Sequence, residues 1–153
     1  MSRLLISIPS ENFKTTATLL EDEAPKTCKG IIQVLPIEGN IMHAMMSGNE
    51  TLIELQGPSK VKLEPENWIF SYVPGDICYW HSFWGDGKYL KDIRDNAEIT
   101  FIYGRHARVR DLAQRETGAN LFARFDSKLD EFAKISKKTR VEGVKHITID
   151  LLR

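Results

Sequence analysis

Apolar and polar residues alternate in several short segments of this 153-residue chain, and clusters of turn residues separate the segments. A period of two is typical of β-strands, because successive side chains point to opposite faces of a sheet. In the first such segment, Leu4, Ile6 and Ile8 share one face. The pattern predicts about eight strands, which lie in residues 3–19 (two strands), 39–57 (two), 67–83 (two), 97–104 and 144–152.

Two further segments have the period of an α-helix. Pro25 suits the first helical position, the acidic residues before it suit the positive end of the helix dipole, and Pro36 ends the segment. A second helix is expected over residues 127–138, with Ser127 as its N-cap. We therefore predict a mainly β fold, in which two flanking α-helices accompany a closed antiparallel β-barrel of about eight strands, in a single domain over residues 1–153.

The charged residues balance, since 21 Lys and Arg accompany 21 Asp and Glu. This balance gives no general attraction to nucleic acid or anionic membranes, and neither is expected as a partner. The chain begins without a signal-peptide pattern and has no apolar run of the roughly 18 residues that span a membrane, so we expect a cytoplasmic protein. Its cysteines, Cys28 and Cys78, are then expected to be reduced, with a single disulfide as the alternative. They lack metal-ligand spacing, and neither a metal nor a cofactor is expected.

Two polar segments are expected to be loops. Residues 84–96 are rich in Gly and Asp, which favours a long loop. Residues 105–115 contain four arginines with little periodicity. In a chain of balanced charge, this basic cluster is expected to be solvated or to lie at an interface.

Part of the sequence resembles cyclophilins, the family that rotates peptide bonds before proline. The resemblance rests on the helix start Pro25-Lys26-Thr27 and on the following strand with Met42-His43-Ala44. Over nearly its full length the chain is more similar to small, uncharacterised cyclophilin-like proteins of bacteria and archaea. The matching pieces are LLEDEAPKT, LPIEGNIMHA, YVPGDI, ITFIYG, NLFARF and EGVKHITI. This resemblance implies a cyclophilin-like barrel with flanking helices, and it implies no activity.

Ala44 stands where cyclophilins place an arginine. Resonance opposes rotation of a peptide bond with a barrier of about 18–20 kcal/mol. A permanently charged guanidinium stabilises the twisted amide, and one positioned donor commonly lowers such a barrier by about 2.7–4 kcal/mol. The Ala44 methyl group donates nothing, so we expect the scaffold without standard prolyl isomerase catalysis.

Five residues are candidates for ligand contacts: His43, Tyr79, His81, Tyr103 and Arg124. The first four are polar groups on otherwise apolar predicted strands, and Arg124 alternates with apolar Phe122 and Phe125. Such isolated polar groups are typical of residues that orient a ligand in an apolar pocket. For each histidine the alternative is a side chain satisfied within the core. For Tyr103 the alternative is a rim residue, and for Arg124 it is an ion pair. Two histidines without a further ligand are too few for a zinc site.

The function that we predict is binding of a small organic molecule, with anionic molecules included, at the mouth of the barrel. An enzyme is the first alternative, either a weak peptidyl-prolyl isomerase or an unassigned hydrolase or isomerase. The second alternative is a homodimer formed through the aromatic residues in 79–84.

Overall fold

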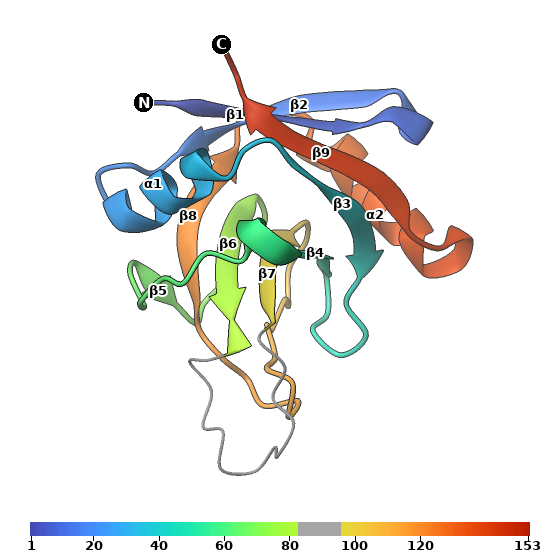
Figure 1. The fold of residues 1–153 in the computed structure, drawn as a ribbon. Coiled ribbons are helices and arrows are strands. Elements are labelled where there is room, and N and C mark those ends of the chain that lie inside the picture. Colours follow the sequence, from blue (N-terminus) through green and yellow to red (C-terminus); the bar gives the residue numbers. More distant parts are fainter. Residues whose placement is uncertain (83–95) are drawn as a thin grey trace.

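Antiparallel pairing joins eight strands into a closed ring in the computed structural model, which describes residues 1–82 and 96–153. Figure 1 shows this ring. Around the ring the order is β1-β9-β3-β4-β7-β6-β8-β2, and the pairing of β2 with β8 closes it. The ninth strand, β5, pairs with β8 outside this ring. The strands are β1 (Arg3–Ile8), β2 (Phe13–Leu19), β3 (Ile37–His43), β4 (Glu50–Glu54), β5 (Trp68–Ile69), β6 (Asp76–His81), β7 (Ala97–Ile102), β8 (Ala119–Phe125) and β9 (Lys145–Leu151).

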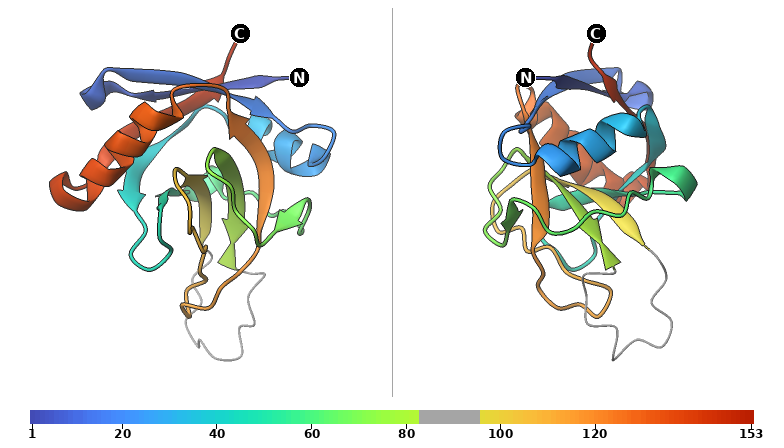
Figure 2. Two further views of the ribbon diagram at one scale, coloured as in Figure 1. Left: turned by 180° about the vertical axis from the view of Figure 1, so that it is seen from behind. Right: turned by 60° about the vertical axis from the view of Figure 1, so that its left-hand side comes forward.

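Two α-helices lie on opposite sides of the ring. Helix α1 (Pro25–Gln33) lies beside β8, and α2 (Leu129–Glu142) lies beside β3, as the front and back views agree (Figures 1 and 2). The 3-10 turns η1 (Pro9–Glu11) and η2 (Gly57–Ser59) complete the described elements. The predicted mainly β fold, with a closed barrel and two helices, is confirmed. Among the described residues, no helix has both the length and the apolar character that crossing a membrane requires.

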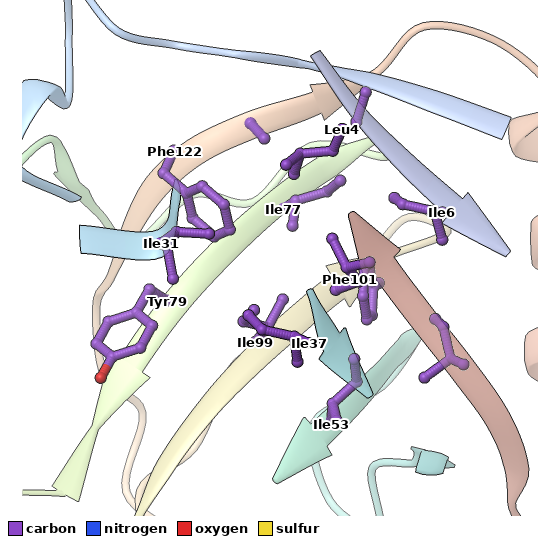
Figure 3. Packing of buried hydrophobic residues seen from close by; sticks show 14 of the residues in the cluster. Leu4, Ile6, Ile31, Ile37, Ile53, Ile77, Tyr79, Ile99, Phe101 and Phe122 are labelled. Atoms are coloured by element: carbon purple, nitrogen blue, oxygen red, sulfur yellow. The ribbon is translucent and has the colours of Figure 1, made fainter. Parts of the chain in front are cut away.

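The core fills the inside of the barrel because alternate residues of each strand point inward (Figure 3). On neighbouring strands Ile53, Ile99 and Tyr79 pair in register, and each is fully buried. Helix α2 adds Phe132, whose ring centroid lies 5.4 Å from that of Phe101. Phe125 and Phe13 contact the same ring at 4.7 and 6.0 Å. This aromatic contact fixes α2 against the barrel and so positions the end of the helix.

Helix α1 follows the sequence pattern closely. It begins at Pro25, as predicted, and it ends at Gln33 instead of continuing to Pro36. The carboxylate of Glu66 accepts the backbone N–H groups of Lys26 and Thr27 at 3.2 and 2.8 Å, so a side chain 39 residues away satisfies the helix start. Gly30 allows a close approach, because a Cβ atom there would lie 3.1 Å from the side chains of Leu63 and Val61.

The start of α2 differs from the prediction. Ser127 does not cap the helix; the N-cap is Lys128, in a left-handed conformation with φ 59° and no side-chain cap. The Ser127 carbonyl instead accepts a hydrogen bond from the Thr15 hydroxyl at 2.8 Å, which ties the helix start to β2. The helix also continues to Glu142, four residues beyond the predicted end. The loop predicted over 84–96 lies, except for Asn96, outside the described residues.

Candidate functional site

His43 and Tyr103 form a hydrogen-bonded pair at the edge of the barrel. The His43 Nε2 atom lies 2.6 Å from the Tyr103 hydroxyl, and the Nδ1 atom lies 2.7 Å from the Ala44 carbonyl oxygen. A carbonyl oxygen only accepts, so Nδ1 carries the proton and donates it to Ala44. In the neutral ring Nε2 is then an acceptor, and it receives the hydrogen bond from the Tyr103 O–H. The two rings meet edge to face, with centroids 5.6 Å apart.

Strand register explains why residues 60 positions apart meet. His43 ends β3 and pairs with Thr51, and Thr51 pairs with Phe101 in β7. Tyr103 follows β7 two residues after Phe101, so it points to the same inward side of the sheet. His43 and Tyr103 are therefore neighbours at the end of the barrel where β3 and β7 end. The prediction that both are polar groups on otherwise apolar strands agrees with this placement.

A pocket of about 370 Å³ lies beside His43, between the end of β3 and the last turn of α2. Its walls are Met42, His43, Ala44, Met45, Thr139, Arg140, Gly143 and Val144. Gly143, with φ 89°, ends α2 in a conformation that favours glycine, and its N–H donates to the Thr139 carbonyl at 3.2 Å. The chain then reverses into β9, so the helix end and the end of β3 enclose the pocket from two sides.

Arg140 brings a positive charge to this pocket. Its side chain is exposed, and within residues 1–82 and 96–153 its guanidinium has neither a hydrogen bond nor an ion pair. It lies close enough to act electrostatically on both His43 and Tyr103. The pocket thus combines a cation, a neutral histidine and apolar walls.

The electrostatics keep the His43–Tyr103 pair neutral. Loss of solvent lowers the pKa of His43 below its ordinary value, the Ala44 carbonyl opposes this change, and the charge of Arg140 adds to it. Loss of solvent likewise raises the pKa of Tyr103, against the opposing effect of Arg140. At neutral pH, Nε2 therefore carries no proton and the tyrosine keeps its own.

Tyr79 and His81 lie elsewhere in the barrel. Tyr79 is fully buried in β6, and its hydroxyl donates to the Val61 carbonyl. His81 is 1% exposed and pairs with Ala97 at the start of β7, whereas Tyr103 follows the other end of that strand. Six residue steps separate Ala97 from Tyr103, or about 20 Å of extended chain. The structure therefore does not bring the two histidines into one cavity.

Arg124 lies in a third part of the barrel, on β8. Its Nε atom lies 3.1 Å from Oδ1 of Asp76, a carboxylate that is almost fully buried. The other oxygen of Asp76 accepts the Val73 N–H at 2.9 Å. Of the two interpretations of Arg124, the ion pair is the one that the structure shows, with a partner on the adjacent strand. The guanidinium also borders a separate hollow of about 400 Å³ near Leu129.

The structure also bears on the predictions about the cysteines, a metal site and the aromatic residues in 79–84. Both cysteines are free and buried, as expected for reduced thiols. Among the described residues, no group of three or more His, Cys, Asp or Glu has a geometry that could hold a metal ion. Tyr79 and Trp80 are at most 1% exposed and cannot contribute to a subunit contact, while Phe83 and Trp84 lie outside the described residues. Arg140 was not predicted as a site residue.

Comparison with known proteins gives a family and a fold. Residues 6–151 match a family described as "Protein of unknown function (DUF3830)". The structure of McbB in complex with tryptophan aligns with a TM-score of 0.68 and 16% identity, over 96% of this chain and 44% of McbB. The solution structure of the hypothetical protein AF2241 from Archaeoglobus fulgidus aligns with a TM-score of 0.56 and 20% identity, over 97% of this chain and 93% of AF2241.

No curated protein sequence matches the chain. The chain spans less than half of the length of McbB, and at these identities both structures share the fold alone. The expectation of an uncharacterised family is confirmed, and the cyclophilin-like relationship stays a prediction.

Proposed function

Because the chain belongs to the DUF3830 family, whose description assigns no function, we propose from its own geometry that it binds a small organic carboxylate in the pocket between β3 and α2. The carboxylate group contacts Arg140, and the rest of the molecule lies against Met42, Met45 and Val144. The observation that carries the proposal is the guanidinium of Arg140, which borders a pocket without a carboxylate partner among the described residues.

The charge at Arg140 favours an anion over a neutral ligand. Hydrogen bonds between a guanidinium and a carboxylate can be bidentate, and hydrogen bonds to charged groups contribute roughly 1.5–3 kcal/mol. The last turn of α2 opposes an anion, because a helix C-terminus carries about half a negative charge. A full positive charge at Arg140 exceeds that half charge, so the local balance still favours the carboxylate.

The rim of the pocket favours a ligand with an apolar part. Met45 is 90% exposed and Val144 is 55% exposed, although both are apolar. Methionine side chains adapt to irregular ligand shapes. McbB, which has a similar fold, is described in complex with tryptophan, a molecule that joins a carboxylate to an apolar ring. An aromatic or branched carboxylate of that size class is the ligand that we propose.

Thermal unfolding with paired probes tests this function. We use 3-phenylpropionate and tryptophan as carboxylates, and the corresponding amides as neutral partners. A ligand at ten times its dissociation constant stabilises the folded protein by about 1.4 kcal/mol. For a chain of this length, that raises the melting temperature by roughly 3–6 °C. The carboxylates should produce this increase and the amides should not.

Two matched variants locate the effect. Arg140→Gln removes the charge at the pocket, and we expect it to weaken binding about tenfold, which corresponds to about 1.4 kcal/mol. Lys134→Gln removes an exposed charge of α2 outside the pocket walls and should leave binding unchanged. If no carboxylate stabilises the wild-type protein, or if both variants bind as it does, the proposed function is wrong.

Peptidyl-prolyl isomerisation is a second candidate, and the same arginine favours it. By the cyclophilin resemblance, Ala44 occupies the position of the catalytic arginine, and Ala44 and Arg140 are walls of one pocket. A guanidinium from α2 offers donors that the Ala44 methyl group lacks. A protease-coupled assay with a prolyl tetrapeptide tests this candidate. The candidate is supported if the wild-type protein accelerates isomerisation above the uncatalysed rate and Arg140→Gln does not. It is wrong if the wild-type protein leaves the uncatalysed rate unchanged.

A further inference from the structure

We infer that the pocket takes up its carboxylate ligand together with one proton, and that His43 Nε2 is the atom that receives the proton. This inference rests on the proposed function, because it concerns the same pocket. It adds to that function a dependence of affinity on pH, which a simple contact with Arg140 would not produce.

The proton positions before binding follow from two hydrogen bonds. Nδ1 donates to the Ala44 carbonyl at 2.7 Å, and the Tyr103 O–H donates to Nε2 at 2.6 Å. His43 is a wall of the pocket, whereas Tyr103 lies behind it and is 5% exposed. The pair is therefore a short chain of donors and acceptors that begins at the pocket wall and ends inside the protein.

The charged and titratable groups around His43 come from each neighbouring element. Helix α2 supplies Arg140, the end of β7 supplies Tyr103, and β9 supplies Lys145. Lys145 forms ion pairs with Glu11 at 3.0 Å and Glu142 at 2.9 Å, so its charge is compensated.

The hydroxyl groups that β4 and α2 place near this end of the barrel, on Thr51, Ser136 and Thr139, carry no charge. Thr51 and Ser136 lie 3.3 Å apart, hydroxyl to hydroxyl. Glu50 pairs with Ile102 and so points to the outer face of the sheet. Arg140 is thus the uncompensated charge that acts on His43 within the described part of the chain.

A bound carboxylate offsets the electrostatic effect of Arg140 on His43. It pairs with the guanidinium and adds a negative charge beside the imidazole, so the charged form of His43 becomes more favourable. On protonation, Nε2 changes from acceptor to donor and donates to the Tyr103 oxygen. The Tyr103 oxygen then serves as the acceptor for the charged ring, while the carboxylate stays on the pocket side of His43. No bond other than the N–H bond forms, and the proton comes from solvent.

Linkage gives the size of the effect. When binding takes up one proton, affinity rises by as much as tenfold for each pH unit as the pH falls, in the range between the pKa values of His43 in the free and bound protein. The dependence disappears below the pKa of the free protein, because His43 is then already charged.

The experiment uses the full chain with labelled histidine rings and 3-phenylpropionate as the probe. Ring nitrogen shifts report the tautomer and protonation of each histidine across a pH series, with and without the probe. We expect the free protein to show Nδ1–H at His43, and the probe to raise the His43 pKa. His146 is exposed in β9 and serves as a reference that should not change. The dissociation constant, measured in parallel, should decrease as the pH falls, and it should lose this dependence in His43→Gln.

The outcomes separate the two claims. Binding with the same affinity across the pH series and an unchanged His43 titration overturns proton uptake and leaves the proposed function intact. A free-protein tautomer with Nε2–H also overturns it, because the hydrogen bonds would then run the other way. If the probe does not bind at any pH, the proposed function fails first. Tyr103→Phe is the second variant: it should retain proton uptake at His43 and bind more weakly at low pH.

Discussion

Replacing Glu50 by Gln should change how the stability of the protein depends on pH. Glu50 is 1% exposed on the outer face of β4, and within the described residues its Oε2 atom has no hydrogen-bond partner. Burial raises its pKa to about 8, the charge of Glu98 adds to this effect, and a hydrogen bond from the Ser47 side chain opposes it. Glu50 is therefore protonated in the folded protein at neutral pH, whereas in the unfolded chain it ionises near its ordinary value of 4.5.

The sign follows from proton release on unfolding. Above about pH 4.5 the unfolded chain binds fewer protons at this site than the folded protein, so a rise in pH favours unfolding. The loss is about 1.4 kcal/mol per pH unit until the pH approaches the folded pKa. Between about pH 5.5 and 7.5, Glu50 should thus remove about 2.5 kcal/mol from the free energy of unfolding. Gln does not titrate, so Glu50→Gln lacks this loss.

Urea unfolding, followed by circular dichroism at three pH values in this range, measures the difference. The free energy of unfolding of Glu50→Gln, relative to wild type, should increase by about 2.5 kcal/mol from the lowest to the highest pH. A constant offset from the amide group does not affect this slope. Glu38→Gln, at an exposed position of β3, should run parallel to the wild type. Parallel lines for Glu50→Gln as well would refute the reasoning, because Glu50 would then be ionised in the folded protein.

Three further results are expected. Burial alone would raise the pKa of Asp126, but hydrogen bonds from Thr16, Thr18 and Arg3 lower it overall. In urea unfolding at neutral pH, Asp126→Asn should therefore lower the free energy of unfolding by roughly 1.5–3 kcal/mol. This loss should fade as acid protonates the wild-type carboxylate, and an equal loss at all pH values would contradict the reasoning. Phe132→Ala should lower the free energy of unfolding by about 3–5 kcal/mol, because the ring is fully buried among three others, and a loss below about 1 kcal/mol would show that α2 docks by other contacts. Cys28 and Cys78 should react with a thiol reagent only after unfolding, because both are buried and burial raises the pKa of Cys28 to about 12; fast labelling of the folded protein would contradict this.

The sequence predicts the barrel because its strands are amphipathic in a simple way. In β1 and β9 the alternate residues Ile6 and Ile149 pair with each other and both are fully buried, as the period of two requires. The turn at 47–49 and the start of α1 at Pro25 are correct for similar local reasons. These features depend on neighbours in the sequence.

The strand β8 was not among the predicted strands. Five successive residues from Ala119 to Ala123 are buried, so the alternation disappears. One reason is a register shift in its pairing with β6, between Ile77 and Cys78. Another is that Cys78 and Leu121 form a second buried cluster, with Tyr72 packed against it. Burial on both faces hides a strand from an argument based on period two.

The candidate site was only partly predictable. The sequence pattern marks His43 and Tyr103 as polar residues on apolar strands, but their contact depends on the register of β3, β4 and β7. His81 looked equivalent to His43, and the antiparallel direction of β6 places it at the far end of β7. Arg140 was missed because the helix was expected to end at 138. Gly143, a typical residue after a helix end, was the signal that could have extended the prediction.

Methyl signals of methionine test the central claim most directly, because the chain contains four methionines and two of them are pocket walls. In protein labelled only at these methyl groups, increasing 3-phenylpropionate should shift the signals of Met42 and Met45 along one saturable curve and leave Met1 unchanged. The same titration of Arg140→Gln should require about tenfold more ligand. If Met42 and Met45 do not respond, or if all four signals drift together without saturation, the pocket between β3 and α2 does not bind carboxylates.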